Sequence, residues 1–169
     1  MNKITFREPK ISDVKSALEM MNSLVDEKAY ITVQEKQTIK NEKDYFKTLF
    51  KEEKEKTRVD LFLDINREVC GSATVSLIDN KTRKHVGELG ILLKKKARGK
   101  GLGEKLFKKI LEKAIKELKI KIATLYVFSE NKIAINLYKK MGFKKVFTIK
   151  DGINHYGKLK DNNLMIKYL

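Results

Sequence analysis

The stretch ARGKGLGEKLF, residues 97–107, decides the fold, because it connects a strand-like segment to a helix-like segment through a glycine-rich turn. Three of the chain's nine glycines alternate there: Gly99, Gly101 and Gly103. Such a turn gathers backbone N–H groups at the positive end of a helix dipole, where a Cβ would obstruct an anion. Arg98 and Lys100 add positive charge, so we expect residues 98–103, Leu102 included, to form a phosphate cradle. The alternative is a plain turn at the start of a helix, which would account for two glycines but less well for three.

Two common nucleotide-binding motifs do not fit this stretch. A Walker loop needs Ser or Thr directly after its lysine, but Gly101 follows Lys100. The dinucleotide fingerprint needs glycines spaced two and three apart, and an acidic residue near position 123 that this chain lacks. The phosphate therefore belongs to another kind of ligand.

Hydrophobic periodicity predicts the elements on both sides of the loop. Strands are expected at 3–8, 59–66, 67–79, 85–95, 122–128, 143–149 and 162–169, and helices at 14–25, 42–56, 103–118 and 133–141, with a loop or short helix at 30–41. This order predicts a mixed sheet with helices on both faces. One proline and no low-complexity linker in 169 residues indicate a single domain, 1–169.

The composition narrows the classes of partner. The net charge of +16 is compatible with nucleic-acid binding. However, only five of the 38 basic residues are Arg, and the Lys residues are scattered among Glu residues. We prefer a solvated surface to nucleic-acid binding. No apolar run approaches the length of a membrane span and no export signal is visible, so we expect a cytoplasmic protein. Cys70 is alone, and His85 and His155 lack metal-ligand spacing, so we expect no disulfide and no metal.

Two motifs resemble those of the GNAT superfamily of N-acetyltransferases. Arg98, Gly101 and Gly103 match its Arg/Gln-x-x-Gly-x-Gly/Ala acetyl-CoA motif, and a second signature, in LYVFSENKIAINLYKKMGF (125–143), matches at Asn131, Ala134, Leu137, Tyr138, Gly142 and Phe143. The resemblance covers almost the whole chain. It implies an α/β (α+β) fold with a mixed, mostly antiparallel sheet of six to seven strands and about four helices on both faces. It also implies transfer of an acetyl group from acetyl-CoA to a primary amine, without a metal.

The resemblance also suggests catalytic residues. A neutral amine is required for attack on a thioester, so an acidic residue must accept its proton. Glu88 is the candidate base, since burial among apolar residues and glycines would make it a better proton acceptor. A carboxylate on the solvated face of an alternating strand fits the pattern equally well. Gly87 and Gly90 indicate that something approaches the backbone closely. Tyr138 is the candidate acid for the leaving thiolate; the alternative is an aromatic core contact.

Coenzyme contacts beyond the cradle are expected along one strand and one helix. The main chain at Ile91, Leu92 and Leu93 should pair with the pantetheine arm, and we expect the Leu92 N–H to serve the oxyanion. Asn131, with Ala134, should contact the pantetheine or cap its helix. Lys139 and Lys140 could reach the 3′-phosphate or be solvated.

The acceptor and the assembly stay open at this point. We favour a protein or peptide N-terminal amine over polyamines, which the net charge would repel, and keep other small amines and a non-catalytic CoA-binding module as alternatives. The loops at 30–41 and at His155-Tyr156 are expected to border the acceptor, and Glu35 could attract a cationic amine. A homodimer is an option, because the last strand could pair across it.

Overall fold

The computed structural model describes residues 3–78 and 81–169. Its elements follow the expected order and are β1 (Ile4–Arg7), α1 (Val14–Asp26), α2 (Ile39–Lys54), β2 (Arg58–Ile65), β3 (Glu68–Leu77), β4 (Val86–Leu93), α3 (Leu102–Leu118), β5 (Ile122–Phe128), α4 (Lys132–Lys140), β6 (Lys144–His155) and β7 (Lys158–Tyr168), with 3₁₀ turns at Ile11–Asp13 and Lys95–Ala97. Asp79, the last residue of an expected strand, and Asn80, in the loop after it, lie outside the described residues.

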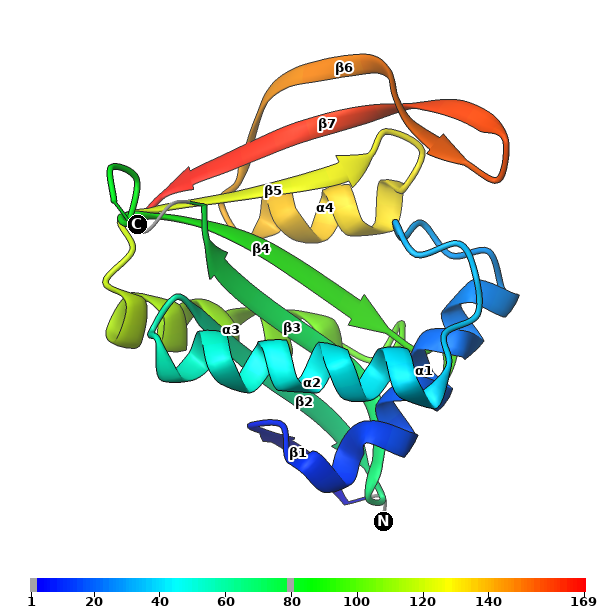
Figure 1. The fold of residues 1–169 in the computed structure, drawn as a ribbon. Coiled ribbons are helices and arrows are strands. Elements are labelled where there is room, and N and C mark those ends of the chain that lie inside the picture. The colour runs from blue at the N-terminus through cyan, green and yellow to red at the C-terminus, as the bar shows by residue number, and fades with distance from the viewer. Residues whose placement is uncertain (1–2, 79–80) are drawn as a thin grey trace.

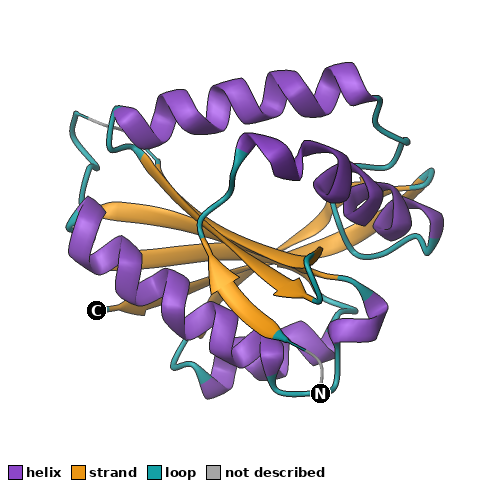
Figure 2. Ribbon diagram, turned by 90° about the horizontal axis from the view of Figure 1, so that it is seen from below, coloured by secondary structure: helices purple, strands orange, loops and turns teal. Residues whose placement is uncertain are grey.

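The seven strands form one sheet in the order β1-β2-β3-β4-β5-β7-β6. Only β4 and β5 run parallel; the other neighbours are antiparallel. Helices cover both faces, with α1 and α2 on one side and α3 and α4 on the other (Figures 1 and 2). The mixed, mostly antiparallel sheet expected from the sequence is confirmed. The idea that the last strand could pair across a dimer is wrong, because β7 lies between β5 and β6, and β6 is the edge strand.

The larger part of the core lies under α3. Leu106, Phe107 and Ile110 are fully buried against residues of β2 and β3 such as Leu63 and Val75. These helix positions recur at spacings of three and four, which places them on one face of the helix. Burial of each such side chain contributes about 1.5–3 kcal/mol to folding. This packing holds α3, and with it the glycine loop at its start, against the sheet.

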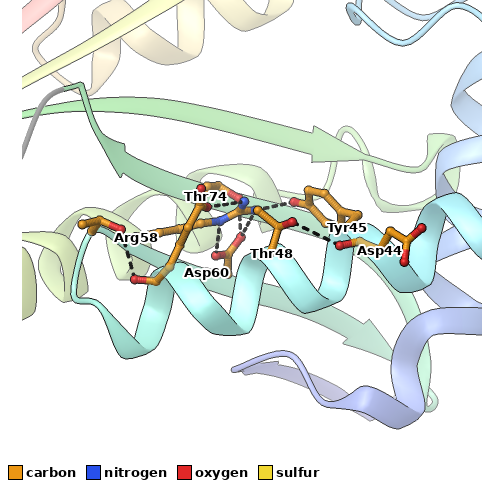
Figure 3. A network of polar contacts seen from close by, with 8 residues as sticks. Asp44, Tyr45, Thr48, Arg58, Asp60 and Thr74 are labelled. Carbon is orange, nitrogen blue, oxygen red and sulfur yellow. Dashed lines mark hydrogen bonds and ion pairs between the residues drawn. The ribbon is translucent and has the colours of Figure 1, made fainter.

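The face under α1 and α2 combines an apolar cluster with a charged one. Phe46 of α2 packs on Phe62 of β2, with ring centroids 6.1 Å apart. Beside this pair, the Arg58 guanidinium donates to both Asp60 carboxylate oxygens, at 2.6 and 2.9 Å, and to the Tyr45 hydroxyl (Figure 3). Thr74 of β3 donates its hydroxyl to Asp60, whose carboxylate is almost completely buried. Buried charges need such complete pairing, so this network fixes α2 over β2 and β3.

Two segment boundaries differ from expectation for local reasons. Helix α2 begins at Ile39 and not at 42, because the Thr38 side chain caps it by accepting from the Asn41 N–H at 3.2 Å. Strand β6 continues to His155, well past the expected end at 149, and the C-terminal hairpin is correspondingly longer. The two strands expected at 59–66 and 67–79 are joined by a tight turn at Asn66 and Arg67, with φ of 54° and 68°, as a two-residue hairpin of the primed type requires.

Glu42 of α2 is a buried carboxylate, 7% exposed, without a hydrogen-bond or ion-pair partner among residues 3–78 and 81–169. Burial raises its pKa from 4.5 to about 6. The folded state therefore binds this proton more tightly than the unfolded state does, and stability is lost as the pH rises from 4.5 through about 6. We expect Glu42→Gln to raise the free energy of unfolding by about 1–2 kcal/mol at pH 7.5 and to leave it unchanged at pH 4.

Urea unfolding at the two pH values measures this effect. Glu19→Gln, at an exposed position of α1, is the matched control and should change little at either pH. An equal gain for Glu42→Gln at pH 4 and pH 7.5 would contradict a titrating carboxylate as the cause.

Candidate active site

The glycine loop precedes α3 as the sequence predicts. Gly99 and Gly101 have φ of 70° and 69°, in the left-handed region that favours glycine, and a Cβ on either would project into open space. Gly101 is the N-cap residue of α3 and offers no capping side chain. The first N–H groups of this 17-residue helix therefore receive no side-chain cap from their N-cap residue, as at many helix N-termini that bind anions.

The third glycine also has a packing role. A Cβ on Gly103 would lie 2.8 Å from the Leu93 side chain, closer than carbon atoms pack. Gly103 therefore lets α3 approach the end of β4, and its place in a phosphate cradle stays a prediction.

Arg98 does not extend freely over the loop. Its Nε donates to the Leu93 carbonyl at 2.9 Å, and both terminal nitrogens bind the carboxylate of Glu27. Glu27 is the C-cap residue of α1, where the loop 27–38 begins. The positive charge expected at Arg98 is thus part of an ion pair that connects the glycine loop to the α1–α2 loop. Lys100, in contrast, is exposed.

Strands β4 and β5 part after a short parallel start. Their pairing ends at Glu88 and Thr124, although β4 continues along β3 to Leu93. The Lys94 N–H donates to the Cys70 carbonyl of β3, and alternate residues of an antiparallel strand point the same way. The Leu92 N–H therefore faces β3, and the expectation that it could serve the oxyanion is wrong. Ile91 and Leu93 are the residues whose peptide groups face the gap.

One face of this gap is open in the middle of the sheet. Glu88, Gly90 and Tyr126 are exposed although β4 and β5 are interior strands. The expected burial of Glu88 is wrong, and its carboxylate has no partner in the described parts of the chain. Thr124, the strand partner of Glu88, instead donates its hydroxyl to the Gly87 carbonyl at 3.3 Å. Glu88, Gly90, Thr124 and Tyr126 form the floor of the gap on this face, and we call these four residues the open strip.

Tyr138 lies on the opposite side of the sheet. It is 6% exposed and packs between Phe107 and Phe143, with ring centroids 5.6 and 6.4 Å away. The alternative of an aromatic core contact is therefore confirmed, and the catalytic role stays a prediction. Burial raises the pKa of Tyr138 to about 12, so the phenol remains protonated at neutral pH.

Asn131 caps the helix that carries Tyr138. Its Oδ1 accepts from the Ala134 N–H at 3.2 Å, so the capping alternative is confirmed. Ala134 is half-buried against the core. Lys140 binds Glu104 of α3 at 2.6 Å, whereas Lys139 is exposed.

The α1–α2 loop and the C-terminal hairpin meet beside the open strip. The Tyr156 N–H donates to Gln34 Oε1 at 2.7 Å, and His155 Nε2 lies 3.0 Å from the Ala29 carbonyl. The Tyr30 ring lies against both Phe128 and His155, with centroids 5.3 and 5.6 Å away. The two expected border segments thus form one continuous wall, while Glu35 is exposed.

The remaining reactive side chains lie elsewhere. Cys70 is fully buried, and burial raises the pKa of its thiol, which makes it a poor nucleophile. His85 is exposed at the start of β4. Within the described residues, no three His, Cys, Asp or Glu side chains are grouped closely enough to hold a metal ion, and no helix there is long and apolar enough to cross a bilayer.

The glycine loop before α3, the parted strands β4 and β5 and the exposed Glu88 form the candidate site. The sequence model of the acetyltransferase (GNAT) family matches residues 19–143. The chain belongs to this family.

Relatives support the same assignment. L-amino acid N-acetyltransferase AaaT of Escherichia coli is 30% identical over 80 residues, which are 47% of this chain. The chain spans about half the length of this curated relative, 49%. Ribosomal-protein-alanine N-acetyltransferase from Brucella melitensis has a TM-score of 0.87 at 22% identity, over 98% of this chain and 99% of the other. A phosphinothricin acetyltransferase from Sinorhizobium meliloti, in complex with AcCoA, has a TM-score of 0.85 at 21% identity, over 98% and 88% of the chains.

Sequence reasoning missed two features of this site. Glu27 gave no signal, because it lies 71 residues from Arg98 in the chain. For Tyr126 the sequence predicts only a place in the strand at 122–128, although its position two residues after Thr124 puts it on the same face as Glu88.

Proposed function

We propose that the protein transfers the acetyl group of acetyl-CoA to an α-amine, of a peptide N-terminus or a small amino compound. The observation that carries the proposal is the gap between β4 and β5, whose pairing ends at Glu88 and Thr124 although β4 continues to Leu93. The AcCoA complex of the Sinorhizobium structure, which has the same fold, supports this ligand. The named acceptors of two relatives, L-amino acids and a ribosomal-protein alanine, support an α-amine.

In this proposal the coenzyme is held mainly by main-chain groups. The N–H groups at the start of α3, from Leu102 onward, bind the pyrophosphate, and Lys100 adds charge. The pantetheine amides pair with Ile91 and Leu93 as a third strand would. The Leu93 carbonyl is already bound to Arg98, so that residue offers its N–H.

In the proposed transfer, the base and the acid act from opposite faces of the sheet. Glu88, on the open strip, accepts a proton from the ammonium, directly or through water, and the free amine attacks the thioester carbon. The Ile91 N–H, facing the gap, donates to the oxyanion. The C–S bond then breaks as the nitrogen loses its second proton to water, and Tyr138 gives its proton to the sulfur; the proton held by Glu88 returns to solvent, from which Tyr138 is reprotonated.

The first test is a thiol-release assay with acetyl-CoA against peptides with free N-termini, amino acid amides and spermidine. We expect turnover with the α-amines, and Glu88→Gln to lower kcat/KM about tenfold or more at pH 7. Because the lost step is deprotonation of the amine, the deficit should shrink as the pH rises above ~8, where the free α-amine is abundant.

Glu112→Gln, at an exposed position of α3, is the matched control and should retain the wild-type pH profile. A Glu88→Gln deficit that is constant with pH would contradict the base role. CoA binding without any turnover would favour the non-catalytic module, and preference for spermidine would favour a polyamine acceptor.

A further inference from the structure

Gly90 has no structural reason to be glycine. Its φ is outside the left-handed region, and a Cβ built on it would meet nothing within 4 Å. Gly87, three residues earlier on the same strand, differs: its Cβ would lie 2.7 Å from the Val75 side chain. A glycine inside a strand costs about 0.5–1 kcal/mol relative to alanine. Gly90 therefore lowers stability without making room for any part of the protein itself.

The space above Gly90 is bounded on its sides. Its partner on β3 is Thr74, whose hydroxyl is held by Asp60 in the network under α2 (Figure 3). Side chains at 88 and 92 share its face of the strand. Leu92 packs against Ile31 and other residues of the α1–α2 loop, which closes that end, whereas Glu88 is exposed at the other.

We propose that Gly90 is the floor of the acceptor subsite, and that its missing side chain accommodates the substituent on the carbon next to the reacting amine. This inference rests on the proposed transferase function. In this proposal the amine attacks beside Ile91 and passes its proton to Glu88. Two residues separate these positions on β4, and one of them, Leu89, faces the core. The carbon next to the amine therefore lies over the other, Gly90. Gly90 thus makes the protein suited to α-amines that bear a side chain, such as substituted amino acids or peptide N-termini.

Bisubstrate conjugates test the subsite by binding alone. CoA joined through an S-acetyl linker to glycinamide carries no side chain, whereas the phenylalaninamide conjugate carries a large one. We expect Gly90→Val to bind CoA and the glycinamide conjugate as the wild type does, and the phenylalaninamide conjugate about tenfold or more weakly, by calorimetry. The thermal midpoint should be unchanged or higher, because valine favours strands and its side chain enters open space.

Gly87→Ala is the control on the same strand. It should lower the thermal midpoint, because its methyl group enters the core, and leave the ratio of the two conjugate affinities unchanged. If the wild type binds both conjugates and Gly90→Val leaves the ratio of their affinities unchanged, the role of Gly90 is overturned while the transferase proposal stands. If the wild type binds neither conjugate more tightly than CoA, the transferase proposal fails and the subsite with it.

Discussion

Gly101→Ala is expected to weaken CoA binding about 100-fold, equivalent to about 2.7 kcal/mol. At φ 69° an alanine costs roughly 1–2 kcal/mol in backbone energy, and relief of that strain would turn the first N–H groups of α3 away from the ligand. The added Cβ also enters the open space that we assign to the pyrophosphate. Calorimetric titration of CoA measures the loss directly.

Gly157→Ala supplies a matched control for backbone strain. Gly157 has a similar φ of 79° and the same open surroundings, but lies in the β6–β7 turn. Both variants should lose a similar amount of stability in urea unfolding, and only Gly101→Ala should lose CoA binding. Equal CoA affinities in the two variants would show that the loop does not hold the coenzyme.

Tyr138→Phe is expected to lower kcat by about 100-fold or more while leaving CoA affinity unchanged. The ring packs between Phe107 and Phe143, and phenylalanine preserves these contacts, so the fold should be retained. Only the hydroxyl proton for the departing sulfur is removed. Steady-state kinetics with the acceptor found in the thiol-release assay, together with a CoA titration, separates the two effects.

The pKa of about 12 adds a second readout for this tyrosine. A phenol with that pKa stays protonated up to about pH 11, so the wild-type rate should show no decline from Tyr138 between pH 7 and 10. Tyr126→Phe, on the open face of the gap, is the matched control. If Tyr126→Phe lowers kcat more than Tyr138→Phe does, the proton comes from the open face instead.

Much of the fold could be predicted because its signals are local. Periodic apolar residues marked α3, and the Asn66-Arg67 pair marked the hairpin between β2 and β3. The position of β7 inside the sheet could not be read in the same way, since strand pairing joins residues distant in sequence. Strand β2 alternates between apolar and polar residues but is buried on both faces. Helix α2 covers its polar face, where Arg58 pairs with Asp60.

In the candidate site, too, local features could be predicted and features that depend on distant segments could not. The glycine loop was recognisable because its backbone conformation needs particular residues in a short stretch. The exposure of Glu88 was not, since it depends on where α1 and α2 stop covering the sheet. The direction of the Leu92 N–H depends on the pairing parity of β3 and β4, which sequence alone does not give.

The ion pair between Arg98 and Glu27 has a consequence for the thermodynamics of ligand binding. A loop with two left-handed glycines would ordinarily sample many conformations, and a ligand that ordered it would lose affinity to that entropy. Here the guanidinium ties the loop to the Leu93 carbonyl and to the end of α1 before any ligand arrives. The entropic cost of shaping the loop is therefore met during folding, which would preorganise the anion site that we propose there.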